Sequence, residues 1–189
     1  TSNIQSFLTL LWDIGLEVGH SVRSVQESLQ QARLDVTVTT ALLDARNICG
    51  TPKMLNQLSE KLRTKAGWKS ATFFSAKADE QKERHAKSNH TEYSLEPNLK
   101  TWPGGLRDIQ TILWIANFHY RTDQLEQLVL ADFLEEAEAR LLSEAQAFLW
   151  KVRFVLHDLY RRDENRLLFE HQRKVAQQLG YADGDQLAV

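Results

Sequence analysis

The segment LEPNLKTWPGGLRDI, residues 95–109, constrains the fold of this chain more than any other part of the sequence. It places two prolines and a glycine pair between long amphipathic patterns. Proline fixes its own backbone and disfavours helix in the residue before it, whereas glycine permits positive φ and close backbone approach. An apolar helical pattern restarts at Leu106, so Gly104 and Gly105 stand at the N-terminus of a predicted helix. The sequence therefore predicts helices on both sides of a chemically particular connector, residues 88–105.

The start of this helix is a candidate anion site. Backbone N–H groups and the helix dipole at an N-terminus favour negative charge, phosphate included. Lys100 and Arg107 would add positive charge from either side. The alternative is a turn that binds nothing, with Arg107 and Asp108 forming an ordinary surface pair. Spacing alone favours this alternative, because most helix starts bind no ligand.

Apolar residues recur with helical spacing over most of the chain, and caps and stop residues divide the pattern. Ser24 and Glu27 have the spacing of a capping box, and Asp35 can cap the next helix. The β-branched residues 36–40 also fit a strand, so two interpretations stay open there. The predicted helices cover residues 4–14, 24–33, 35–48, 51–66, 70–87, 106–120, 123–129, 135–162 and 169–179. In the longest, the residues expected to face inward are Leu141, Leu142, Ala145, Phe148, Leu149, Val152, Val155, Leu156 and Leu159.

One short segment has a different periodicity. Residues 16–23, LEVGHSVR, alternate between apolar and polar side chains, which predicts a half-buried strand. A lone strand cannot stand by itself, so its partners are expected to be missing or to come from another chain. Glu17 would point away from the face that carries Leu16 and Val18, and an ordinary exposed acid is the alternative for it. The predicted fold class is mainly α, a helical bundle with one N-terminal β-strand.

Composition excludes several classes of function. The formal net charge is -2, so no global basic field indicates binding to DNA or RNA. The single cysteine, Cys49, fits a reducing cytoplasm. No apolar run approaches the roughly 20 residues of a membrane span, and no signal peptide is visible. Neither a zinc-binding histidine pair nor a glycine-rich nucleotide motif is present. We therefore expect a cytoplasmic chain that binds no nucleic acid and no membrane.

Four segments resemble one known family. They are LLWDIGLEVGHSVRS, DVTVTTALLDAR, LEPNLKTWPGGLRDIQTILW and FLWKVRFVLHDLYRRDENRLLFEHQRKVAQQLGY. The chain is similar over essentially its whole length to the bifunctional uridylyltransferase/uridylyl-removing enzymes, which modify the PII nitrogen-signalling protein. The resemblance implies a polymerase-β-like nucleotidyltransferase that moves UMP from UTP to a tyrosine of PII. The resemblance therefore implies a magnesium-dependent transferase of nitrogen metabolism, since Mg²⁺ would neutralise charge on the phosphates.

The resemblance assigns roles at the N-terminal end. Glu17 is the candidate for the third catalytic carboxylate and for a metal ligand, and Asp13 is the alternative. His20 and Arg23 would support this site. The predicted strand would be what is left of a truncated nucleotidyltransferase sheet. The family's Gly-Ser turn and Asp-x-Asp pair are absent and would precede this chain, so Mg²⁺ binding would need residues outside it and the isolated chain would be inactive.

The resemblance also assigns roles in the connector. Lys100, Gly104, Gly105 and Arg107 would line the nucleotide and phosphate side, and Asp108 would hold Arg107. The family often has a small polar residue where this chain has Trp102, which puts the packing at that point in doubt.

The expected organisation has two parts. Residues 1–50 would be the C-terminal remnant of the nucleotidyltransferase domain, and residues 51–189 the helical PII-uridylyltransferase-associated domain. The rest of the enzyme, its HD hydrolase and ACT domains, would lie beyond this chain. The alternative function is a non-catalytic helical interaction module that docks PII or neighbouring domains.

Overall fold

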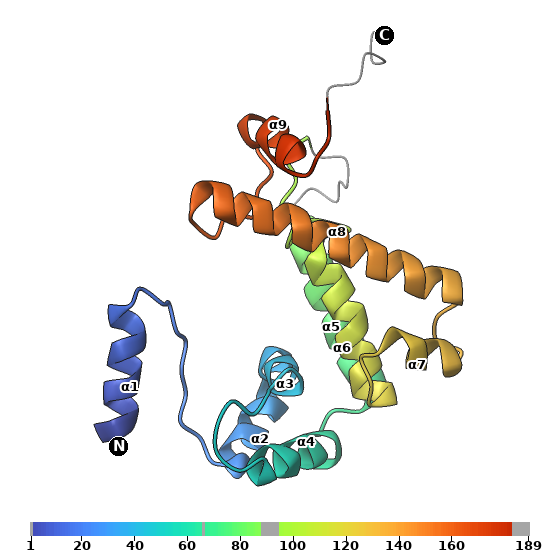
Figure 1. Ribbon diagram of the computed structural model, residues 1–189. Coiled ribbons are helices and arrows are strands. Elements are labelled where there is room, and N and C mark those ends of the chain that lie inside the picture. Colours follow the sequence, from blue (N-terminus) through green and yellow to red (C-terminus); the bar gives the residue numbers. More distant parts are fainter. Residues whose placement is uncertain (1, 66, 88–94, 183–189) are drawn as a thin grey trace.

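A computed structural model describes residues 2–65, 67–87 and 95–182 of the chain. Within these ranges the chain is mainly helical and forms no sheet, as Figure 1 shows. The helices are α1 (Ser2–Asp13), α2 (Val25–Leu34), α3 (Val36–Leu43), α4 (Lys53–Lys65), α5 (Ser70–Ala86), α6 (Leu106–Tyr120), α7 (Leu125–Leu130), α8 (Glu136–Tyr160) and α9 (Phe169–Gln178). No described helix combines the length and the apolar character needed to cross a bilayer. The predicted helical bundle is confirmed.

Local caps set the beginnings of α2 and α3. The Ser24 side chain and Glu27 form the predicted capping box at α2. At α3 the Asp35 carboxylate accepts the Thr37 N–H at 2.6 Å. Residues 36–40 are therefore helical despite their β-branched side chains, and the strand alternative for them is wrong. The buried Thr39 hydroxyl donates to a carbonyl of α2.

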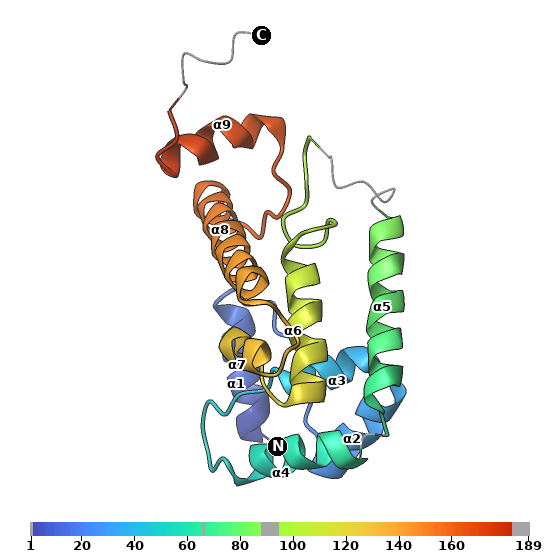
Figure 2. The ribbon, with the colours of Figure 1, turned by 90° about the vertical axis from the view of Figure 1, so that its right-hand side faces the viewer.

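The core consists of clusters at successive levels of the bundle. Leu29, Ala32 and Leu62 hold α2, α3 and α4 together. The α5 and α6 helices pack against each other (Figure 2), where Phe73 stacks on Phe118 with ring centroids 4.2 Å apart. The α8 helix crosses one end of this pair and contacts α9 (Figure 1). The boundary predicted at residues 50 and 51 falls between α3 and α4 and stays a prediction.

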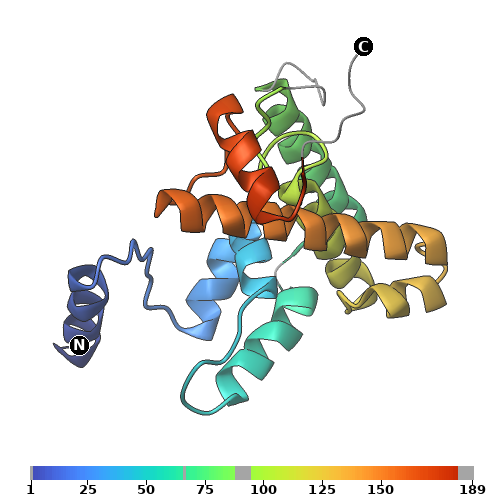
Figure 3. The ribbon, with the colours of Figure 1, turned by 45° about the horizontal axis from the view of Figure 1, so that its top comes forward.

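The N-terminal part differs from the sequence prediction. The strand predicted over residues 16–23 is not formed, and this segment joins α1 to α2 as irregular chain. A strand needs hydrogen-bond partners on a neighbouring strand, and the described part of the chain offers none. The α1 helix stands apart from the other helices in Figures 1 and 3, with Phe7 and Trp12 exposed.

The inward face of α8 is narrower than predicted. Val152 and Leu156 are buried, as expected, and pack with Leu99 and α9. Leu141 and Phe148 were also expected to face inward, but they are 66% and 50% exposed. At about 100° per residue they lie on the flank of the stripe centred near Leu156, and neighbouring helices cover only its centre.

Leu156→Ala tests this assignment of faces. The substitution leaves a cavity in a closely packed cluster, so we expect it to lower the free energy of unfolding by about 2–5 kcal/mol. The matched control is Leu141→Ala on the exposed flank of the same helix, which should change stability by less than about 0.5 kcal/mol. Urea denaturation followed by circular dichroism measures both. Equal losses would contradict the assignment.

Candidate functional site

Residues 88–94 of the connector lie outside the described part of the chain, and its described part, residues 95–105, folds back onto the start of α6. The N–H groups at this helix start donate to carbonyls of the connector and of the first turn. The bonds are Gly105 N–H to Trp102 O (2.9 Å), Leu106 N–H to Leu99 O (2.9 Å), Arg107 N–H to Lys100 O (2.8 Å) and Asp108 N–H to Gly105 O (3.0 Å). A phosphate bound at this helix start would have to displace these bonds. The phosphate-binding role of Gly104 and Gly105 stays a prediction.

Gly105 is required by the close approach of the backbone. A Cβ at this position would lie 2.9 Å from the carbonyl oxygens of both Leu99 and Trp102. Gly104 has a φ of +77°, which disfavours other residues. The glycine pair therefore shapes the connector so that its carbonyls can reach the first turn of α6.

The connector is also held against the loop between α8 and α9. The Leu99 N–H donates to Asn165 O at 2.8 Å, and the Leu167 N–H donates to Pro97 O at 2.9 Å. Between these bonds lies an isolated antiparallel bridge that joins Asn98 to Arg166. The connector and the α8–α9 loop, which are distant in sequence, are thus in direct contact.

Asp108 is the centre of the polar contacts around the connector. Its carboxylate accepts hydrogen bonds from Gln81, Arg84 and the Gly104 N–H, and it pairs with His85 at 2.9 Å. The expectation that Asp108 holds Arg107 is corrected, because its ion-pair partners come from α5.

Arg107 makes a different contact. Its guanidinium lies over the Trp114 ring, 5.2 Å from the centroid, which is a cation–π arrangement. Because Trp114 is buried in the α5–α6 core, this contact places Arg107 without neutralising its charge.

The surroundings of Asp108 stabilise its charged form. Burial raises the pKa of the carboxyl, but the hydrogen bonds from Arg84, Gln81, the Gly104 N–H and His85 together outweigh that effect. The pKa of Asp108 therefore lies below its ordinary value of 3.8. The carboxylate is ionised near neutral pH and links the connector to α5 as an anion.

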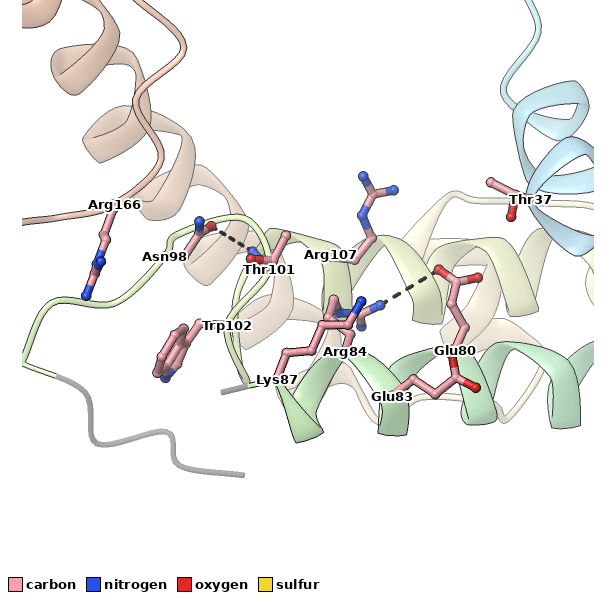
Figure 4. A pocket seen from close by; sticks show the side chains of 10 residues that line it. All are labelled: Thr37, Glu80, Glu83, Arg84, Lys87, Asn98, Thr101, Trp102, Arg107 and Arg166. Atoms are coloured by element: carbon pink, nitrogen blue, oxygen red, sulfur yellow. Dashed lines mark hydrogen bonds and ion pairs between the residues drawn. The ribbon is translucent and has the colours of Figure 1, made fainter. Parts of the chain in front are cut away.

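A basic cavity lies beside this anchor (Figure 4). Its volume is about 700 Å³, within the range of small-molecule sites. Four cationic and two anionic side chains line it, so its local formal charge is positive although the chain carries -2. The lining residues are Thr37, Glu80, Glu83, Arg84, Lys87, Asn98, Thr101, Trp102, Arg107 and Arg166.

The sequence identified one lining cation of this cavity and missed three. Arg107 lines it as predicted, whereas Lys100, Gly104 and Gly105 are not among the lining residues. Arg84 lies on α5, Lys87 caps the C-terminal end of that helix and Arg166 lies in the loop after α8, so none of them belongs to the local motif around Arg107. The spacing of Arg84 and Lys87 places both cations on one helix face, which could have indicated a basic site. An ordinary charged face exposed to solvent has the same pattern, so the sequence does not distinguish the two.

The predicted catalytic residues lie elsewhere. Glu17 is exposed in the irregular segment after α1 and lines a separate surface pocket with Trp12 and Leu16. Asp13 ends α1, and the His20 ring lies 5.5 Å from that of Trp12. Figures 1 and 3 place this segment away from the connector, so the structure does not bring the two predicted groups together.

The donor set does not complete a magnesium site. Among the described residues no group of three or more His, Cys, Asp or Glu side chains could hold a metal ion. Glu17, the predicted metal ligand, therefore belongs to no such group, and Arg23, predicted to support it, is exposed. Magnesium sites on phosphate substrates normally gather two or three carboxylates.

The fold and the basic cavity define a helical segment with a site suited to an anionic ligand. Residues 72–189 match the family model described as GlnD PII-uridylyltransferase. The chain belongs to this GlnD PII-uridylyltransferase family, and the resemblance seen in the sequence is confirmed.

Individual relatives are named "Bifunctional uridylyltransferase/uridylyl-removing enzyme". The chain is 53% identical over 187 residues to that of Pseudomonas aeruginosa (strain UCBPP-PA14), which covers 98% of this chain and 21% of the relative. It is 55% identical over 180 residues to that of Pseudomonas putida (strain GB-1), covering 95% of this chain and 20% of the relative. For Azotobacter vinelandii the identity is 54% over 187 residues, 98% of this chain and 21% of the relative. The chain thus spans about a fifth of the length of these relatives, and no solved structure matches it.

Gly105→Ala tests the closeness of the connector to α6. The added methyl group meets two backbone carbonyls that cannot rotate away, so we expect a loss of about 1–3 kcal/mol in unfolding free energy. Gly19→Ala is the control, because a Cβ there has nothing within 4 Å. Chemical denaturation compares the two variants, and an unchanged Gly105→Ala midpoint would contradict the described geometry.

Asp108→Asn tests the anchor. A carboxyl with a lowered pKa contributes stability that is present above its unfolded pKa of about 3.9 and is lost as pH falls through the folded value. We expect the variant to lose about 1.5–3 kcal/mol at pH 7 and to show a smaller further loss below about pH 4 than the unmutated chain. Denaturation curves from pH 7 to pH 3 measure this dependence.

Asp79→Asn serves as its control, since Asp79 forms an exposed pair with Lys82. This variant should keep the acid dependence of the unmutated chain. Identical pH profiles for the Asp108 and Asp79 variants would refute the role of Asp108 as an anchor.

Proposed function

We propose that this chain is the helical part of a nucleotidyltransferase that transfers UMP from UTP to a tyrosine of the PII protein and so acts in nitrogen regulation. Membership of the GlnD PII-uridylyltransferase family and the names of the relatives support this function. The chain spans about a fifth of those relatives, so we assign it to a larger enzyme of the cytoplasm. The proposed partners of that enzyme are UTP and PII, and its HD and ACT domains are proposed to lie outside this chain.

The observation that carries the proposal is the position of Arg107. It stands in the first turn of α6, directly after the connector, and lines a cavity whose other cations include Arg84 and Lys87. Guanidinium and ammonium groups gathered in one cavity suit the charge of a triphosphate. We assign Arg107 to the phosphates of UTP, while Lys100 and the glycine pair shape the connector that leads into the helix of Arg107.

The catalytic carboxylate is proposed to be Glu17, with Asp13 as the alternative, supported by His20 and Arg23. Mg²⁺, when bound, would neutralise charge on the triphosphate. The described residues do not complete its site, so the proposal requires carboxylates from outside this chain. The isolated chain is accordingly proposed to be inactive in transfer.

The proposed organisation assigns residues 1–50 to the end of the nucleotidyltransferase domain and residues 51–189 to the helical domain. A second candidate function is a non-catalytic module that docks PII or a neighbouring domain. Two observations favour it: the N–H groups at the start of α6 are engaged within the chain, and α1 exposes large apolar side chains.

A chimeric enzyme separates the two functions. This chain would replace the matching segment of the Pseudomonas aeruginosa relative, and UMP transfer from labelled UTP to PII would be followed. We expect the chimera to be active and Arg107→Ala to lower kcat/KM for UTP about tenfold to a hundredfold, because a charged contact to phosphate is lost.

The control is Arg140→Ala, which removes an exposed charge on α8 outside the cavity and should leave transfer unchanged. Full activity of the Arg107 variant would favour the docking module over a phosphate role. Robust transfer by the isolated chain would refute the need for outside carboxylates.

A further inference from the structure

One end of the basic cavity carries groups that no phosphate role explains. Figure 4 shows the indole of Trp102 there, near Asn98 and Arg166. The Trp102 backbone is fixed on both sides, since its N–H donates to Asn98 O at 3.1 Å and its carbonyl accepts the Gly105 N–H. The backbone that carries the indole is therefore fixed on the connector, and the side chain lines the cavity.

Asn98 presents a defined polar group at the same end. Its Oδ1 accepts the N–H groups of Lys100 and Thr101, both at 3.0 Å. Since the NH₂ group of an asparagine side chain can only donate, the atom that accepts these two bonds must be the oxygen, which fixes the orientation of the amide. The Nδ2 group is then a donor with no described acceptor, available to a carbonyl or ring nitrogen of a ligand.

Three of the four lining cations, Arg84, Lys87 and Arg107, occupy the middle of the cavity, and the fourth, Arg166 at the Trp102 end, pairs with Glu96. Arg84 is paired with Asp108, but neither Lys87 nor Arg107 has an ion-pair partner among the described residues. An anion between these two groups would relieve the repulsion of like charges. In Figure 4 the carboxylates of Glu80 and Glu83 lie on the side away from Trp102. A ligand that binds its anionic part at Lys87 and Arg107 would extend away from these carboxylates. Its neutral part would then lie at the Trp102 end.

We propose that the cavity binds a whole nucleotide, with its phosphates at Lys87 and Arg107 and its base stacked on Trp102. The inference rests on the proposed function and adds to it that the helical segment holds the base as well as the phosphates. Stacking of a base on an aromatic side chain suits a ring at the cavity wall, and the Asn98 amide would donate to the edge of the base.

Calorimetric titration of the chain with two probes tests this inference. The probes are the magnesium salts of UTP and of inorganic triphosphate, which has the phosphate groups of UTP but lacks its ribose and base. We expect UTP to bind at least tenfold more tightly. Trp102→Ala should weaken UTP binding about tenfold to a hundredfold and leave triphosphate binding unchanged, because only the stacked base is lost.

Matched variants separate stacking from other effects. Trp102→Phe keeps an aromatic face and should retain most of the affinity, whereas Arg107→Ala should weaken both probes. Trp150→Ala removes an exposed tryptophan of α8 outside the cavity and should change neither. Circular dichroism confirms that each variant is folded, and the comparison of the two probes needs no variant at all.

Three results would overturn the inference. They are equal affinities for UTP and triphosphate, unchanged UTP binding by a folded Trp102→Ala variant, and no binding of UTP at millimolar concentration. Each leaves the proposed function standing if the chimera transfers UMP. Conversely, a chimera that is inactive while the chain binds UTP through Trp102 would refute the proposed function alone.

Discussion

The architecture around the connector depends on the charge of Asp108. This carboxylate stands in the first turn of α6 and ties that turn to two other regions, because its partners lie on α5 and at the glycine turn. Loss of the carboxylate would leave the Gly104 N–H without its acceptor and Arg84 with only its longer pair to Glu80. The position of Arg107, and with it the cation-rich middle of the cavity, follows from how the connector is fixed at this point.

Signals that lie close together in the sequence predicted the structure well. The capping box of Ser24 and Glu27 and the glycine pair before α6 involve residues within a few positions of each other, and both features are present. Arg107 was found because it belongs to such a local motif. The pairing of Asp108 with Arg84 spans 24 residues, and no local pattern indicates it.

Features that depend on a partner were predicted poorly. The alternation in residues 16–23 is a real strand pattern, yet a strand forms only where another strand accepts its hydrogen bonds. Leu141 and Phe148 follow the helical period of α8, but burial is decided by which neighbours reach that flank. The remaining lining residues of the cavity, Arg166 among them, required the tertiary structure. The hydrophobic periodicity thus predicted the helices, but it did not predict which of their side chains pack against other helices.

The bonds between the connector and the α8–α9 loop have a consequence for the order of folding. The Phe169 N–H reaches the Glu96 carboxylate across 73 residues, and the Gln172 side chain reaches the Leu95 carbonyl across 77. Contacts of such separation must close a long loop before they form, whereas α2, α3 and α4 meet through near neighbours in sequence. The cavity is therefore expected to assemble late, after the N-terminal cluster, and to depend on the last helices of the chain for its completion.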